Sequence, residues 1–374
     1  MKLIILKEKL YEGVKIVERI SQKSLSLPIL ENTLLKAEKN FLKLSTTNLE
    51  SGINWQGLAK IEKEGEVCVP TRFLSNLISS LPNKPIELEL KGLTLNLRCD
   101  NYTTKIKGLS PEDFPIIPRP KEEQVVEVEN LEFCQSLNQI INIPSPSNTR
   151  PEISGVFLSF GKNMIKMVAT DSFRLAEKKI TLKTGLSNEY SLIIPHSAAK
   201  EIAGVFGEKE GGLKICLSPN QALFEYKNEE MSQPQIQFTS RLIEGDYPDY
   251  EEIIPQKYNT KTQVDRKEFL NQIKTASLFS GKVNEVKVAV KTKEKKIEII
   301  SQNPDLGEYR SFLKAKVDGE DITISFNHRF LSGGASEIKK DKILFNLTNE
   351  DGPAAIKPLG VDDYLYIIMP IKPS

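Results

Sequence analysis

The sequence predicts an α+β protein that repeats one unit three times, with two helices and about eight mainly antiparallel strands in each copy. One observation behind this prediction is a proline-rich stretch, DFPIIPRP from Asp113, which returns in related form as DYPDYEEIIP from Asp246. Because proline fixes its own φ and keeps its predecessor extended, we interpret both stretches as connectors. The other observation is that the segments between the connectors share one order of helical and strand patterns. The expected domains span residues 1–121, 122–253 and 254–374.

Each copy is expected to open with a short strand that runs into a helix. The three opening segments are MKLIILKEKLYEGVKIVERI, VVEVENLEFCQSLNQII and TKTQVDRKEFLNQIKTA. Apolar residues recur at helical spacing in each, at Leu10, Val14 and Val17 in the first and at Leu270 and Ile273 in the third. These residues should face the core.

A hairpin follows in every copy. The segments are TLLKAEKNFLKLSTTNLE, GVFLSFGKNMIKMVATDSFRLA and VKVAVKTKEKKIEIISQNPDLGE. Two alternating runs flank a lysine-rich turn, and the second run ends in polar residues that favour another turn. Because all three copies have this polar turn, we interpret it as structural. Only the middle copy adds Phe173, Arg174 and Leu175 directly after it.

A further strand, a second helix and closing strands complete each copy. The second helices lie in EVCVPTRFLSNLISSL, SLIIPHSAAKEIAGVF and ITISFNHRFLSGGASEI, and the word RFLS at 72–75 returns at 329–332. Only the last copy ends in an apolar run, YIIMPI from Tyr366. That run could be a strand packed on its own domain or one wall of a binding groove, because flexible apolar groups at a chain end suit both.

Composition and charge narrow the class of protein. The 374 residues are 39% hydrophobic and 27% charged, with a formal net charge of +1, far less basic than a tight nucleic-acid binder. The scattered Cys68, Cys99, Cys134 and Cys216 are expected to be core residues in a reducing compartment. No stretch is long enough for a signal peptide or a membrane span, so we expect a cytoplasmic protein.

The sequence gives no sign of catalysis. His196 and His328 occupy matching places at the starts of second helices, which favours a structural role. No Ser/His/Asp set or metal-ligand spacing gathers around Asp171, and SGGAS from Ser332 lies in a helical segment without the lysine of a phosphate loop. We therefore expect a protein that is not an enzyme and needs no cofactor or metal.

An ordered set of words along the whole chain resembles the bacterial DNA polymerase III beta subunit family, the sliding clamps. The words are LPILENTLL from Leu27, TTNLE from Thr46, LSPEDFP from Leu109, VATDSFRLA from Val168, FTSRLIEGDYPDY from Phe238, QNPD from Gln302 and YIIMPI from Tyr366. The resemblance implies a head-to-tail homodimer, closed into a six-domain ring around duplex DNA, with helices lining the channel and strands outside. It also implies partners that include the polymerase III alpha subunit, the clamp loader and other proteins with clamp-binding motifs.

Such a ring agrees with the near-neutral charge. Topology prevents escape from DNA, so the channel needs only a mildly basic lining. The helical segments offer basic residues away from their apolar stripes, and we expect these to face DNA: Lys15, Arg19, Lys23, Arg72, Lys200, Lys267, Lys274, Arg329, Lys339 and Lys340. The opening helix of the second copy is the exception, with Gln135, Gln139 and Asn142. Each charge alone could be a solvated surface residue, and a protein-binding scaffold that never meets DNA stays possible on sequence grounds.

The resemblance also implies two protein-binding surfaces. A groove for short linear motifs is expected at Ile153, Thr170, Ser172, Phe173, Arg174, Leu175, Pro248, Ile253, Ile367, Met369, Pro370 and Ile371. A dimer interface is expected to join Lys105 and Ile106 of one protomer to Leu278 and Phe279 of the other. The family often has glycine and then histidine or tyrosine at Ser172 and Phe173, and it often ends in a basic residue and leucine instead of Lys372-Pro373-Ser374. These departures leave the preferred motif open.

Overall fold

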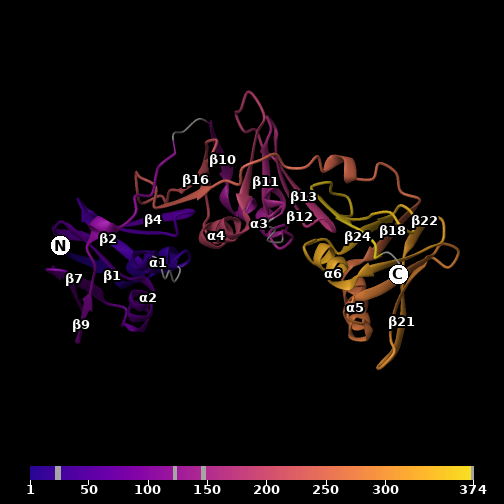
Figure 1. The fold of residues 1–374 in the computed structure, drawn as a ribbon, viewed down its shortest axis with the longest axis horizontal. Helices are drawn as coiled ribbons and strands as arrows, with labels where there is room; N and C mark the ends of the chain where they lie inside the picture. The colour runs from indigo at the N-terminus through magenta and orange to yellow at the C-terminus, as the bar shows by residue number, and fades with distance from the viewer. Residues whose placement is uncertain (22–26, 121–123, 145–148, 372–374) are drawn as a thin grey trace. The chain divides into compact units, whose positions relative to one another are not determined.

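The computed structural model describes residues 1–21, 27–120, 124–144 and 149–371. Within them it has six α-helices and 26 strands (Figure 1). The first copy contains β1 (Lys2–Leu6), α1 (Lys7–Glu18), β2 (Asn32–Glu38), β3 (Phe41–Thr47), β4 (Ser51–Leu58), β5 (Lys60–Lys63), β6 (Gly65–Pro70), α2 (Thr71–Ser80), β7 (Pro85–Lys91), β8 (Thr94–Cys99) and β9 (Tyr102–Lys107).

The later copies follow the same order. The second contains β10 (Gln124–Glu129), α3 (Asn130–Asn138), β11 (Gly155–Phe160), β12 (Met164–Thr170), β13 (Arg174–Thr181), β14 (Tyr190–Pro195), α4 (His196–Phe206), β15 (Gly212–Leu217), β16 (Gln221–Tyr226) and β17 (Ile236–Arg241). The third contains β18 (Thr260–Asp265), α5 (Arg266–Ala276), β19 (Glu285–Lys291), β20 (Lys296–Asn303), β21 (Gly307–Lys314), β22 (Lys316–Gly319), β23 (Ile322–Asn327), α6 (His328–Ser336), β24 (Lys342–Leu347), β25 (Ala354–Pro358) and β26 (Tyr364–Ile368). The predicted fold class is confirmed.

The copies are joined by sheet pairing. Each of the two later copies lays its last strand, antiparallel, on the strand that follows the hairpin turn of the preceding copy, so that β17 pairs with β4 and β26 with β13. The corresponding strands at the two ends of the chain, β9 and β21, are edge strands of their sheets. One pairing rule therefore accounts for both internal junctions, and among the strands that it concerns only β9 and β21 have no junction partner.

Contacts divide the chain into two compact units, and the boundary between the units falls within the second copy. Unit 1 holds residues 1–135, 184–187 and 197–243, and unit 2 holds the remainder. The division follows the sheets, because the eight-stranded sheet that contains the β17–β4 pair lies in unit 1 and the nine-stranded sheet that contains the β26–β13 pair lies in unit 2. The repeat boundaries near residues 121 and 253 stay a prediction.

Helix packing agrees with the apolar stripe read from the first copy. In the third copy Ile273 is buried as expected, but Phe269 takes the core position expected for Leu270, which is only partly buried. In unit 1, α1 packs on β3, β4 and α2, and Leu10, Val14 and Val17 are fully buried. Gly13 of the same helix lies against the Trp55 ring, where an added Cβ would come within 2.5 Å of ring carbons. In unit 2, α5 packs on α6, with Ile273 fully buried. All four cysteines are buried and free, as expected.

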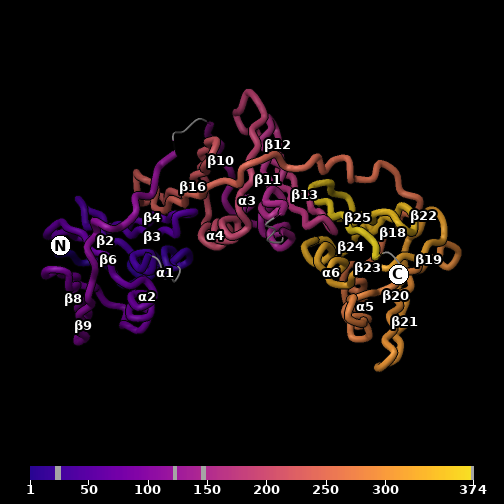
Figure 2. The backbone as a smooth tube through the Cα atoms, in the orientation of Figure 1, coloured from indigo at the N-terminus to yellow at the C-terminus, as the bar shows by residue number. Residues whose placement is uncertain are grey.

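Both proline-rich stretches are connectors, as predicted, each with one short 3-10 turn, at Pro111–Asp113 and Glu251–Ile253. The first holds Phe114 against the apolar cluster of Ile29, Leu30 and Cys68. The second lies between β17 and β18 in the sequence, and Figure 2 shows it as the orange tube that leads to β18. In the described residues, no helix is both long enough and apolar enough to cross a membrane.

Candidate functional site

The turn between β12 and β13, at the second junction, is held by a closed set of hydrogen bonds. Thr170 Oγ1 donates to the Arg174 carbonyl (2.8 Å) and accepts from Ser172 N (3.2 Å). Asp171 Oδ1 accepts from the backbone N–H groups of Phe173 and Arg174, both at 3.0 Å. Ser172 therefore adopts the left-handed region, at φ 75°. Glycine adopts this conformation without a Cβ penalty, which explains why glycine suits this place.

Arg174 links three elements around this turn. Its Nε donates to Asp171 Oδ2 (2.9 Å) and its Nη2 to the Asn142 carbonyl beyond α3 (3.1 Å). Its guanidinium also lies 4.7 Å from the ring centroid of Phe330 in α6. Phe173 stacks on the same ring, with centroids 6.5 Å apart, yet its side chain is 62% exposed. The exposed Phe173 ring is thus supported from below by the Phe330 ring, which also contacts Arg174.

The chain end continues the ladder beyond β26. Met369 N donates to the Phe173 carbonyl (2.9 Å), and Ile371 N donates to the Ser325 carbonyl of β23 (2.8 Å). All five residues of β26 are buried, whereas Met369, Pro370 and Ile371 are partly exposed. The run up to Ile368 is a core strand, as one of the two interpretations expected. The residues after it lie at the surface beside Phe173, and their part in a binding groove stays a prediction.

The second connector packs on this junction through its aromatic residues. Tyr247 and Tyr250 contact Phe157, and the Tyr247 ring is stacked on it at 4.8 Å. Tyr250 also donates to the buried Glu177 (2.6 Å), and burial together with this bond raises the pKa of the Tyr250 phenol. Tyr250 belongs to an apolar cluster with Leu175 and Ile367, and Tyr247 packs against this cluster.

The structure joins Thr170 to Arg174, Phe173 to Met369 and Leu175 to Ile367, and the expected groove residues differ in depth. Ile153, Leu175 and Ile367 are buried beneath the surface, whereas Ser172, Phe173 and Ile253 are exposed. Thr170, Arg174, Pro248 and the residues after β26 lie between these extremes. The sequence reading missed Phe330 and Tyr250. The two tyrosines of DYPDY could have indicated that the connector packs on the junction. No local sequence pattern indicated that Phe330 lies there.

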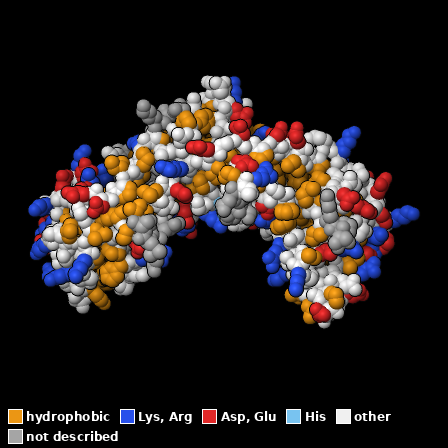
Figure 3. Space-filling model, in the orientation of Figure 1, with side chains coloured by type: hydrophobic (Ala, Val, Ile, Leu, Met, Phe, Trp, Pro, Cys, Tyr) orange, Lys and Arg blue, Asp and Glu red, His pale blue; other side chains and the backbone are white. Residues whose placement is uncertain are grey.

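The expected DNA-facing residues are exposed wherever they are described, and Lys23 lies outside the described residues. Lys15 pairs with Glu18 at 3.0 Å, and Arg19 pairs with Glu201 at 2.6 Å, so their charges are partly offset within the chain. In contrast, no ion pair with another described residue engages the exposed Arg72, Lys200, Lys267, Lys274 or Arg329, which lie on α2, α4, α5 and α6. Lys339 and Lys340 are exposed beyond α6. On the face drawn in Figure 3, basic and acidic side chains are interspersed.

The expected dimer residues lie on or beside the free edges. Lys105 and Ile106 belong to edge strand β9, where Lys105 is exposed and Ile106 is buried, at 4% exposure. Leu278 is 68% exposed after α5, and Phe279 stacks on Tyr309 of edge strand β21 at 5.9 Å. Ile106 is therefore a core residue in the protomer, and β9 presents its backbone and its exposed side chains.

Three family models of the DNA polymerase III beta subunit match the chain in order. The N-terminal domain model matches residues 1–118, the central domain model 127–249 and the C-terminal domain model 251–372. The curated beta sliding clamp of Bacillus subtilis (strain 168) is 27% identical over 386 residues, with 100% of both chains covered. The solved DNA polymerase sliding clamp of Bacillus subtilis superposes with a TM-score of 0.94 at 26% identity, and a sliding clamp from Bartonella birtlesii bound to griselimycin with 0.92 at 25% identity, each with 100% of both chains covered.

The left-handed Ser172 gives a stability test of the turn. Ser172→Gly should raise the free energy of unfolding by up to about 1 kcal/mol, because relief of the Cβ clash outweighs the larger chain entropy that glycine loses. Ser79→Gly, at an exposed position in α2, should instead lower it by about 0.5–1 kcal/mol. Urea unfolding of both variants measures the difference. If both variants lose the same free energy of unfolding, the Ser172 side chain, and not its φ, governs the stability of this turn.

Proposed function

Because the chain belongs to the DNA polymerase III beta subunit family, we propose that the surface around Phe173, Arg174 and Met369 is where it holds the proteins it tethers to DNA. The chain is a DNA sliding clamp. It is a non-catalytic homodimeric ring around duplex DNA that binds the replicative polymerase and other proteins with clamp-binding motifs. It confers processivity because a tethered polymerase cannot diffuse away.

The observation that carries the ring architecture is the single pairing rule of the sheets. Each copy after the first covers an edge of the preceding copy, which leaves β9 and β21 uncovered at the two ends of the chain. Exposed edges invite pairing because their N–H and C=O groups lack partners. We infer that β9 of one protomer pairs with β21 of the other, twice per ring, by the rule that joins the copies within the chain.

Apolar side chains should seal this interface. Leu278 is 68% exposed and Phe312 on β21 is 61% exposed, while Tyr102 on β9 is 50% exposed. Exposed side chains of this size at opposite free edges favour contact between protomers. We place Leu278 and Phe279 in the interface, facing Lys105 and the backbone at Ile106.

We propose that the unpaired cations on the helices contact DNA phosphates loosely. The best candidates are Arg72, Lys200, Lys267, Lys274 and Arg329, because no described carboxylate neutralises them. Arg19 is the weakest candidate, since its ion pair with Glu201 already offsets its charge. A small number of phosphate contacts gives weak, salt-sensitive attraction, which suits a ring that must slide.

The partner surface suits a short extended peptide with large apolar anchors. Phe173 offers an exposed aromatic face, and Met369 is an adaptable neighbour joined to its backbone. Ordering a flexible peptide offsets much of the gain from burial, so each contact should be modest, near micromolar, or about 8 kcal/mol. We place this exchange of partners in the cytoplasm.

Encirclement predicts that retention depends on DNA topology. Protein loaded by a clamp loader onto nicked circular DNA should remain bound at moderate salt and dissociate when the circle is linearised, because ends let a ring slide off. Gel filtration before and after restriction cutting measures this. Equal retention on the circle and the linear product would contradict the ring.

The interface predicts that Leu278→Ala/Phe279→Ala yields monomers. Each large side chain removed from a buried contact costs roughly 2–5 kcal/mol, and a ring loses both contacts twice. Multi-angle light scattering gives the mass. Leu58→Ala, at an exposed leucine on internally paired β4, is the control and should stay dimeric. A dimer mass for the double variant would move the interface elsewhere.

The partner surface predicts that deletion of Met369–Ser374 abolishes motif binding and leaves the ring intact. The deletion removes the backbone bonds to Phe173 and Ser325 but keeps all of β26. Calorimetry with a peptide from the polymerase tail should show affinity at least about tenfold weaker, a loss of about 1.4 kcal/mol. Dimer mass and retention on circular DNA are the controls. Unchanged peptide affinity in the folded, truncated protein would reject this surface.

A further inference from the structure

The first junction contains the same turn as the second. Thr47 Oγ1 donates to the Ser51 carbonyl (2.8 Å) and accepts from Leu49 N (3.0 Å), as Thr170 does at the second junction. Asn48 Oδ1 accepts from the N–H groups of Glu50 (3.1 Å) and Ser51 (2.7 Å), as Asp171 does for Phe173 and Arg174. Leu49 has φ 74° where Ser172 has 75°.

The strand of the following copy meets this turn in the same way. Arg241 N donates to the Glu50 carbonyl at 2.8 Å, just as Met369 N donates to the Phe173 carbonyl at 2.9 Å. In the third copy, where no strand of the chain covers β21, the turn is different: its positive φ falls on Gly307, at 111°. The shared geometry thus belongs to the two junctions, and Glu50 and Arg241 stand where Phe173 and Met369 stand in the other.

The first junction also has a cavity. It has a volume of about 350 Å³, and its lining includes Leu49, Ile116 and Pro118. Gly52 stands where the second junction has the buried Leu175, and an added Cβ there would come within 2.6 Å of the Ile117 side chain. The Ile117 side chain of the connector packs into the place of the missing side chain, and both residues line the cavity. Leu49 is 47% exposed and Ile116 is 92% exposed, so the cavity offers accessible apolar walls beside the polar Glu50 and Arg241.

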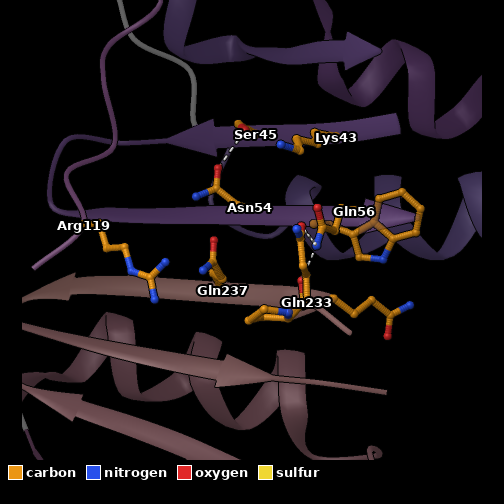
Figure 4. Close-up of a pocket in the computed structure, with 10 residues that line it drawn as sticks. Lys43, Ser45, Asn54, Gln56, Arg119, Gln233 and Gln237 are labelled. Carbon is orange, nitrogen blue, oxygen red and sulfur yellow. Dashed lines mark hydrogen bonds between the residues drawn. The ribbon is translucent and has the colours of Figure 1, made fainter. Parts of the chain in front are cut away.

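A second, polar cavity of about 500 Å³ follows along the same strands (Figure 4). Gly52 and Asn54 are alternate residues of β4, opposite Thr239 and Gln237 of β17, so they face the same side of the sheet. Asn54 Oδ1 accepts from Ser45, and Gln237 Nε2 donates to Glu225, which leaves the Asn54 amide N–H groups and the Gln237 carbonyl for a ligand. An extended peptide backbone offers the matching acceptors and donors.

We propose that the first junction is a second docking site for short linear peptides, on the eight-stranded sheet of unit 1. One aliphatic side chain enters the cavity between Leu49 and Ile116, and the extended backbone crosses the amides of Asn54 and Gln237. An acidic residue beside the anchor pairs with Arg241, which lines the first cavity and has no carboxylate partner among the described residues. The clamp would then hold two different partners per protomer. The proposal draws on the second-junction surface for its analogy, but it stands on its own cavity.

The test counts sites by calorimetry. The probe is a short synthetic peptide that alternates leucine with threonine and carries an aspartate beside each leucine. The intact protein should bind two peptides per protomer, and the protein that lacks Met369–Ser374 should bind one. Adding Ile116→Ser/Arg241→Ala to the truncated protein should weaken the remaining site at least roughly tenfold. Both substituted residues are exposed, so the fold should be kept. Leu93→Ser, at an exposed leucine that lines neither cavity, is the matched control and should leave binding unchanged.

The outcomes separate the two surfaces. No binding to the truncated protein would overturn this second site and leave the second-junction proposal standing. Two peptides bound to the truncated protein, with one lost in the Ile116→Ser/Arg241→Ala variant, would support the second site and reject the second-junction surface. A probe with lysine in place of aspartate should bind the truncated protein more weakly and recover with Arg241→Glu. Equal binding of both probes would overturn the acidic-peptide assignment. Methyl NMR of the isoleucines should shift Ile116 and Ile117 on binding.

Discussion

Backbone pairing across the junctions is the constraint on which the rest of this structure depends. A strand edge carries N–H and C=O groups that need partners, and the chain satisfies two such edges by laying the last strand of one copy on the preceding copy. Within the chain, the repeat pairs these edges, but the equivalent strands at the two ends, β9 and β21, are left without such a partner. In the proposed ring a second protomer covers both edges, by the pairing that already joins the copies within the chain.

The junctions are also where both proposed binding surfaces lie. A covered strand must begin at a sharp turn, and that turn exposes the side chains next to it while its backbone is held by Thr170 and Asp171, or by Thr47 and Asn48. Rigid backbone with exposed side chains limits the entropy lost on binding. Sequence divergence between the copies then makes one junction aromatic and cationic, with Phe173 and Arg174, and the other polar, with Glu50 and Ser51. The same backbone turn therefore presents different side chains at the two junctions.

Electrostatics plays a smaller part than in proteins that grip nucleic acid. The net charge is +1, and several cations on the helices are already paired, as Arg19 is with Glu201. Exposed ion pairs of this kind contribute about 0–1 kcal/mol each, so they cost little to keep and reduce the attraction for phosphate. A closed ring cannot leave DNA sideways, so its inner surface does not need to bind DNA tightly.

The sequence by itself determined the repeat, the helices, the hairpins and the connectors. Those features are local: Leu10, Val14 and Val17 recur at helical spacing, and proline restricts its own neighbourhood. It also identified the turn at Thr170–Leu175 as particular to the middle copy in its side chains. Tertiary structure alone decided that Ile106, Leu175 and Ile367 are buried, that Arg174 rests on Phe330, and that the connector packs on Gly52 beside a cavity. These depend on which distant strands pair, and a distant pairing leaves no mark on the spacing of residues in either strand.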